Sequence, residues 1–305
     1  MRPELPPAVL TAPPTGWRVW WTATRPRTLS IAATPVLVGT ALALAEGAAP
    51  AWFAMLTALC CAVLIQVGTN LHNDAADFER GTDQPDRIGP LRVTAAGWAS
   101  PAAVRRAAVI SFALALLLGI YLVRVGGWPI LAAGVASLLA GWSYSGGRHP
   151  VSHTPLGELF VLIFFGLVAV AGSHWLQLGA WSANAWLAGI VVGMPAAAVL
   201  LVNNYRDMEQ DRRAGRRTLA VLLGRARARR VYFVLMTMPF PAMLGLALHG
   251  RPGAAFGLLA LPFCLLLCRR LAVTAPGPAL NLLLAATARA GFVTAALLAL
   301  GLLLF

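Results

Sequence analysis

Long apolar runs alternate with short polar stretches along almost the whole chain. Each run approaches the length of about 20 residues that a helix needs to cross the hydrocarbon core of a bilayer. Polarity within the runs does not alternate residue by residue, as it does in the strands of a membrane β-barrel. The pattern therefore predicts an all-α, polytopic membrane protein with about nine transmembrane helices. The expected spans are residues 28–46, 50–73, 101–122, 128–145, 157–177, 183–206, 229–248, 252–271 and 279–304.

The composition agrees with this pattern. Of the 305 residues, 59% are hydrophobic and only 11% are charged, which excludes an ordinary soluble protein. The net charge of +13 could suggest nucleic acid as a partner. Lysine is absent, however, and almost all arginines lie in the short stretches between apolar runs. We therefore expect membrane lipid around the protein and no nucleic-acid partner.

The arginines are distributed unevenly between alternate loops. With the N-terminus placed inside, the outer loops contain only Arg124 and Arg251, and the inner loops contain nearly all the others. The positive-inside rule then places the N-terminus and the inner loops in the cytoplasm of a cell with a bacterial inner (plasma) membrane. We expect residues 1–24 to form a cytoplasmic N-terminal tail and residues 25–305 to form a single nine-helix domain.

The segment from Gln66 to Arg92 concentrates acidic residues at the end of the second apolar run. It contains five of the eleven carboxylates of the chain. In a helix, Asn70 and Asp74 are i,i+4 neighbours, as are Asn73 and Asp77, so these side chains project into one region. Carboxylates held this close repel each other, and a bound cation is the natural compensation.

A second cluster follows the sixth apolar run. Asn203, Asp207 and Asp211 repeat every four residues and so define one helical stripe. The topology places this stripe on the same side of the membrane as the first cluster. We interpret the two clusters as two halves of one metal site; mutually satisfied loop charges are the alternative interpretation.

The residues beside the clusters indicate a phosphate-bearing substrate. Magnesium is usually bound through one or two carboxylates together with phosphate oxygens of a substrate. Arginine forks suit phosphate oxygens as well. A lipidic tail attached to such a diphosphate would extend into the membrane core, which suggests a prenyl diphosphate. The candidate arginines are Arg87, Arg92, Arg148, Arg212, Arg213, Arg216 and Arg217.

Several motifs resemble those of the UbiA superfamily of intramembrane aromatic prenyltransferases. NDAADFERGTD at 73–83 and NNYRDMEQD at 203–211 resemble its two aspartate-rich motifs. YSGGR at 144–148 resembles its YxxxK motif, with Arg148 in place of the commoner lysine. RPRTL, RIGPLR, LGE and AGRRTLAVLLG are similar to the branch that prenylates dihydroxynaphthoate in menaquinone synthesis. The resemblance implies nine membrane helices around a central cavity with cytoplasmic cap loops.

The resemblance also assigns roles to residues. Two Mg2+ sites would be formed by Asn70, Asn73, Asp74 and Asp77 and by Asn203, Asp207 and Asp211. Tyr144 and Arg148 would lie between the sites, near the bond that breaks. The further substrate-binding candidates are Asp83, Arg87, Arg92, Arg216 and Arg217.

The implied reaction joins a polyprenyl chain to 1,4-dihydroxy-2-naphthoate at the carbon that bears the carboxylate, with loss of carbon dioxide. An arginine should hold that carboxylate; Arg25, Arg27 and Arg289 are the candidates. Glu158 could orient a naphthol hydroxyl or accept its proton, and a helix-capping or ion-pairing role is the alternative.

Other functions are open at this point. Another member of the superfamily could act on 4-hydroxybenzoate, homogentisate, haem or chlorophyllide. A divalent-cation transporter would place acids deep in the spans or on both faces, but Glu46 is the only acid expected outside. A scaffold that binds anionic lipid would explain the arginines but not the Asn–Asp stripes.

Overall fold

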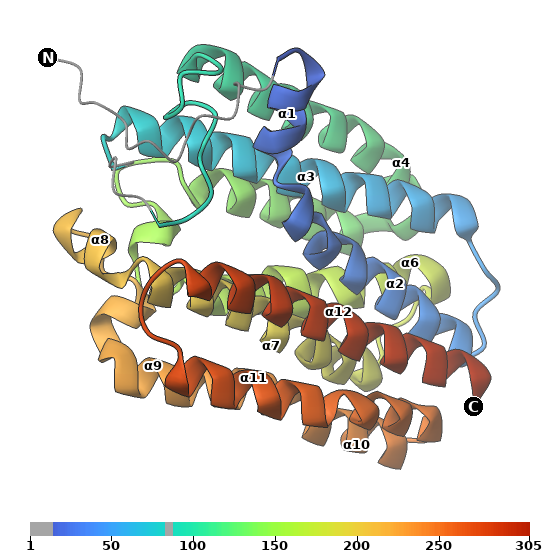
Figure 1. Ribbon diagram of the computed structural model, residues 1–305. Coiled ribbons are helices and arrows are strands. Elements are labelled where there is room, and N and C mark those ends of the chain that lie inside the picture. Colours follow the sequence, from blue (N-terminus) through green and yellow to red (C-terminus); the bar gives the residue numbers. More distant parts are fainter. Residues whose placement is uncertain (1–14, 83–87) are drawn as a thin grey trace, which may run out of the picture.

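The computed structural model describes residues 15–82 and 88–305, apart from the side chain of Arg27. Every regular element in these ranges is helical, which confirms the predicted all-α class (Figure 1). The α-helices are α1 (Trp17–Thr24), α2 (Leu29–Ala45), α3 (Trp52–Glu79), α4 (Pro101–Ser143), α5 (Gly157–Val161), α6 (Ala169–Leu178), α7 (Ala183–Arg206), α8 (Met208–Arg213), α9 (Leu219–Thr237), α10 (Pro239–Leu248), α11 (Leu261–Val273) and α12 (Ala279–Leu304). The 3-10 turns η2 (Pro26–Thr28), η3 (Val151–His153) and η5 (Pro252–Ala260) and the π-helical η4 (Leu162–Val168) complete them.

Seven helical stretches of the described chain are long and apolar enough to cross a membrane, or eight if α1 and α2 form one bent span. Three of them join shorter elements: α5 with η4 and α6, α9 with α10, and η5 with α11. The chain is therefore a multi-pass membrane protein. Length and composition alone do not reproduce the expected number of nine.

The difference between the expected nine spans and the observed seven or eight lies largely in α4, which is a helical hairpin. A straight helix of 43 residues would be about 65 Å long, more than twice the thickness of the hydrocarbon core. Gly127 breaks the helix with φ 67° and ψ −151°, which glycine adopts readily. Beyond it the chain folds back, since the rings of Phe112 and Trp142 lie 6.2 Å apart. The break falls between the predicted spans 101–122 and 128–145.

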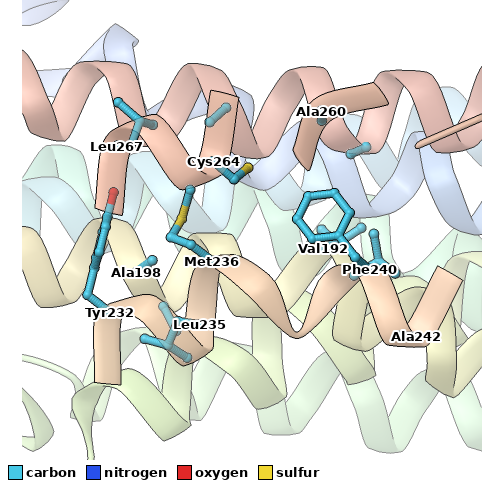
Figure 2. Packing of buried hydrophobic residues seen from close by; sticks show 14 of the residues in the cluster. Val192, Ala198, Tyr232, Leu235, Met236, Phe240, Ala242, Ala260, Cys264 and Leu267 are labelled. Atoms are coloured by element: carbon cyan, nitrogen blue, oxygen red, sulfur yellow. The ribbon is translucent and has the colours of Figure 1, made fainter. Parts of the chain in front are cut away.

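The most deeply buried span is α7. Of its most apolar 18-residue window, 72% is buried inside the protein. Close packing against η4 requires glycine, because a Cβ on Gly166 would lie 2.5 Å from the carbonyl oxygen of Gly189. On its other side, α7 packs against α9 and α10 through the apolar cluster in Figure 2, where Tyr232, Met236 and Phe240 are labelled. This packing holds the second acidic stripe in a fixed position.

Residues 17–24 of the predicted N-terminal tail form helix α1. Its buried face consists of Val19 and Ala23, which pack against residues of α3 and the segment after it, including Leu71. Three tryptophans, Trp17, Trp20 and Trp21, are exposed on the opposite face. After α1, Arg25 takes a left-handed conformation with φ 54° and turns the chain into α2.

Candidate active site

A cavity of about 590 Å³ lies among α2, α3, both halves of α4, the α5–α6 run and α7. Most of its wall is apolar, from Ala58 and Leu116 to Phe164 and Leu176. A group of amide, hydroxyl and guanidinium side chains is the exception. These polar lining residues are Arg25, Gln66, Thr69, Asn70, Asn73, Arg92, Arg124, Ser137, Tyr144, Ser152, Ser173, Asn203, Asn204 and Arg216. The cavity therefore combines an apolar body with a strongly polar region.

Arg216 connects the two acidic clusters. Its Nη2 lies 2.8 Å from Oδ1 of Asp77, and its Nη1 lies 3.6 Å from Oδ1 of Asp211. The same guanidinium donates to Oγ1 of Thr82 at 2.7 Å. The carboxylates that the sequence predicted to face each other thus lie within reach of one side chain, at the end of the bundle where α8 lies (left in Figure 1).

The first cluster lies at the end of α3. Asp77 is fully buried and accepts a 2.6 Å hydrogen bond from Arg92, so its charge is compensated on both sides. Asn73 donates to Ser145 and accepts from Arg25 at 3.3 Å. The carboxylate of Asp74 turns the other way and accepts from Thr94 and from the backbone N–H of Val93. It ties down the segment after α3 and, like Asp77, Asp207 and Asp211, does not itself line the cavity.

The Asn70 side chain is oriented by neighbours at the α1 end of the cavity. Its amide donates to the carbonyl oxygen of Thr24 at 3.0 Å, and its Oδ1 accepts from Gln66 at 3.2 Å. Asn70 and Asp74 are i,i+4 neighbours on α3, but their side chains contact different partners. Asn70 contacts Thr24 and Gln66, whereas Asp74 contacts Val93 and Thr94.

The second cluster lies where α7 meets α8. The guanidinium of Arg206 donates to both oxygens of Asp207, at 2.7 and 2.6 Å, and to Oδ1 of Asn203 at 2.9 Å. The helix breaks at Asp207, with φ −91° and ψ 7°, but Asp211 N–H still donates to its carbonyl oxygen. The stripe thus remains continuous, and Asn281 of α12 supports it through Arg206.

The carboxyl group of Asp211 ionises less readily than usual. Burial raises its pKa to about 6; the Arg216 guanidinium offsets part of this effect, and the carboxylates of Asp207 and Asp77 add to it. A cation at this position would relieve that unfavourable charge.

The donor chemistry of the two clusters fits Mg2+, because it consists of carboxylate and amide oxygens. Over residues 15–82 and 88–305, no three acidic, histidine or cysteine side chains converge into a metal site by themselves. Amide oxygens and substrate phosphates would have to complete the coordination, as is usual for Mg2+. Arginines now contact Asp77, Asp207 and Asp211, so metal binding would compete with these ion pairs.

Tyr144 and Arg148 both follow the end of α4, and a turn separates them. Tyr144 lines the cavity, and its ring centroid lies 6.3 Å from that of Phe160. Burial, together with the negative charges of Glu158 and Asp77, raises the pKa of its hydroxyl, which stays protonated at neutral pH. Arg148 is exposed and does not line the cavity. The helix ends at Ser143, and Gly147 turns the chain with φ 79°.

The other arginines predicted to bind substrate differ in whether they line the cavity. Arg25 and Arg92 line the cavity. Arg217 and Arg289 are exposed and do not line it. Asp83, Arg87 and the Arg27 side chain lie outside the described part of the structure.

Gln66, Ser152 and Asn204 are among the polar lining residues that sequence reasoning missed. Gln66 precedes Asn70 by one helical turn, and this spacing could have identified it. Asn204 follows Asn203 directly, but the spacing of four residues that links Asn203 to Asp207 and Asp211 does not include it. Ser152 belongs to η3, and no pattern in the sequence marks it.

The comparisons with known proteins agree with this geometry. Residues 32–281 match the UbiA prenyltransferase family. The chain is 38% identical to the 1,4-dihydroxy-2-naphthoate octaprenyltransferase of Mycobacterium tuberculosis, over 81% of this chain and 83% of that protein. It is also 38% identical to the Escherichia coli enzyme of the same name, over 72% of this chain and 73% of that protein.

A solved structure shares the fold. A UbiA homologue from Archaeoglobus fulgidus bound to DMAPP and Mg2+ superposes with a TM-score of 0.62, covering 91% of this chain and 99% of that chain, at 16% identity. The resemblance drawn from the motifs is thereby confirmed over most of the chain. The protein belongs to the UbiA prenyltransferase family.

Proposed function

We propose that this protein transfers a polyprenyl chain from its diphosphate to 1,4-dihydroxy-2-naphthoate, with loss of the carboxylate and release of diphosphate, giving demethylmenaquinol. The observation that carries the proposal is the cavity, whose apolar body meets Arg92 and Arg216; these arginines in turn contact acids from two distant parts of the chain. The relatives named for this reaction support the choice of acceptor. A divalent-cation transporter would not require the long apolar cavity.

The diphosphate belongs at the polar region of the cavity. Arg92 and Arg216 line it and carry the positive charge that phosphate oxygens require. Asn70, Asn73 and Asp77 on one side, and Asn203, Asp207 and Asp211 on the other, would hold Mg2+. When bound, Mg2+ neutralises charge that develops on the leaving diphosphate.

The prenyl chain would lie along the apolar wall. Ionisation of the carbon–oxygen bond leaves an allylic cation, which water would quench. Phe160 and Phe164, whose rings pack at 4.7 Å, exclude water from this wall and present ring faces to positive charge. Tyr144 beside them keeps its proton and can donate to a departing phosphate oxygen.

The acceptor carboxylate needs a cation on the wall of the cavity. Arg25 lines the cavity and donates a 3.3 Å hydrogen bond to the amide oxygen of Asn73. We assign it to the acceptor, in preference to the exposed Arg289. We place this end of the bundle, with the N-terminus, on the cytoplasmic side, because the arginine-rich loops gather there.

A transfer assay in reconstituted membranes tests the proposal. Purified protein would be given a prenyl diphosphate with either 1,4-dihydroxy-2-naphthoate or 4-hydroxybenzoate, with Mg2+ and with excess EDTA. We expect a prenylated, decarboxylated naphthoquinol only with the naphthoate and only with Mg2+. Product from the benzoate alone would contradict the assigned acceptor, and equal turnover in EDTA would contradict the metal.

A further inference from the structure

Asn204 and Glu158 form a buried pair beside the cavity. Asn204 comes from α7 and lines the cavity, whereas Glu158 comes from α5 and does not. Nδ2 of Asn204 lies 2.9 Å from Oε1 of Glu158. Only 4% of Glu158 is exposed, so the carboxylate is held behind the wall.

This contact determines how the amide of Asn204 faces the cavity. The amide nitrogen can only donate, and Oε1 of Glu158 accepts from it, so the NH2 group of Asn204 points toward Glu158. The carbonyl oxygen, Oδ1, is then the group left to accept a hydrogen bond from the cavity side. A buried carboxylate therefore selects the polarity of a neutral group on the wall.

One oxygen of the Glu158 carboxyl group, Oε2, has no hydrogen-bond partner among the described residues. Buried side-chain oxygens in folded proteins nearly always have a partner, and an exception calls for an explanation. A purely structural role would be served better by a carboxylate with both oxygens bonded, or by an apolar pair.

We propose that Oδ1 of Asn204 accepts a hydrogen bond from a ring hydroxyl of the aromatic acceptor, and that Glu158 is the positioning residue that holds the amide in this orientation. The inference deepens the proposed function and rests on it. Arg25, which also lines the cavity, would attract the carboxylate of the acceptor. The ring is thus oriented by one accepting oxygen and one cation.

This assignment changes the role expected for Glu158. Asn204, and not Glu158, contacts the naphthol hydroxyl, and Glu158 acts by orienting the amide of Asn204. Replacing Glu158 by glutamine should be tolerated, because the amide oxygen of glutamine can still accept from Nδ2 of Asn204. Replacing it by leucine removes the acceptor and frees the amide to rotate.

The test compares acceptor binding by equilibrium dialysis for 1,4-dihydroxy-2-naphthoate and for 2-naphthoate, which lacks both hydroxyls. The wild-type protein should prefer the hydroxylated compound, and Asn204→Leu should abolish most of this preference, by about tenfold. Glu158→Leu should follow Asn204→Leu, and Glu158→Gln should stay close to wild type. Glu209→Gln, on an exposed carboxylate of α8, is the control.

Turnover supplies the second readout. Asn204→Leu should raise the KM for the naphthoate about tenfold and leave the KM for the prenyl diphosphate within about twofold. Equal effects on both KM values, or an unchanged preference for the hydroxylated compound in Asn204→Leu, would overturn the inference. If the wild-type protein binds the hydroxylated compound preferentially but forms no product, the proposed function fails and the inference stands. If it shows no such preference, the inference itself fails.

Discussion

Arg216 lies 2.8 Å from Asp77, although Asp77 belongs to the first aspartate-rich motif and Arg216 follows the second. The ion pair joins the end of α3 to the segment after α8, and through Asp211 it reaches the second cluster. One guanidinium therefore contacts an acid from each half of the proposed metal site. In the ligand-free protein it occupies the region where a diphosphate with its metal would be bound.

Loss of Arg216 should damage catalysis far more than loss of its sequence neighbour. Arg216→Gln removes the contacts with Asp77, Asp211 and Thr82, and we expect kcat/KM to fall at least about 100-fold, since charged contacts in buried sites cost several kcal/mol to break. Arg217→Gln is the matched control, because its side chain is exposed and outside the cavity wall. Similar losses in both variants would indicate a general effect of loop charge.

Asp77 should be needed for both stability and turnover. Asp77→Asn removes the negative charge that the buried guanidinium of Arg92 contacts at 2.6 Å, which should lower the free energy of unfolding by about 3–5 kcal/mol. Thermal unfolding in detergent measures this effect, and the transfer assay at low temperature measures the activity that remains. Glu79→Gln, an exposed acid on the same helix, should behave like wild type. An Asp77→Asn variant with normal unfolding and normal activity is incompatible with the role assigned to Asp77.

The carboxyl of Asp211 predicts a pH dependence in the metal-free protein. Its folded-state pKa of about 6 lies above the ordinary value of 3.8, so the folded protein binds this proton more tightly than the unfolded chain. The resulting stabilisation is complete below about pH 4 and is lost as the pH rises through 6; it is on the order of 3 kcal/mol. Unfolding in EDTA at pH 4.5 and 7.5 measures it.

The variant Asp211→Asn isolates this effect from other titrating groups. It cannot ionise, so the difference in unfolding free energy between wild type and variant should grow toward pH 7.5, with the variant more stable. A difference that does not change with pH would show that Asp211 titrates normally.

The apolar body of the cavity should limit the length of the prenyl chain. Gly134 lines the cavity, and a Cβ added there meets no atom within 4 Å. Gly134→Phe should therefore fold normally, retain transfer from a short prenyl diphosphate and lose transfer from a long one, which mass spectrometry of the products would show. Leu139→Phe, on an exposed position of the same helix, should not change chain-length preference.

The helical pattern was informative wherever the chemistry depends on local spacing. Asn70, Asn73 and Asn203 line one cavity, as their periodic positions at the ends of apolar runs suggested. Arg216 was one of several candidate arginines, and only tertiary packing distinguishes it from the exposed Arg217. The all-helical class and most apolar spans were predictable because apolar runs of membrane length have few alternative structures in lipid, although the expected number of nine is not reproduced.

Other features depend on contacts that no spacing encodes. Asp74 shares the stripe with Asp77, but the segment after α3 supplies Val93 and Thr94 as donors and turns it away from the cavity. The YSGGR motif suggested that Tyr144 and Arg148 act together, but α4 ends before them and the turn separates them. The hairpin at Gly127 depends on a single left-handed residue within a long apolar stretch.

The central claim is that acids from both clusters hold one diphosphate through Mg2+, and the Kd of a non-reactive prenyl thiolodiphosphate measures it most directly. With Mg2+, the wild-type protein should bind the analogue tightly, and EDTA should weaken binding at least about 100-fold. Asp77→Asn and Asp211→Asn should each cause a comparable loss, because each cluster supplies part of the same site. Binding of wild-type strength in either variant, or in EDTA, would contradict the account.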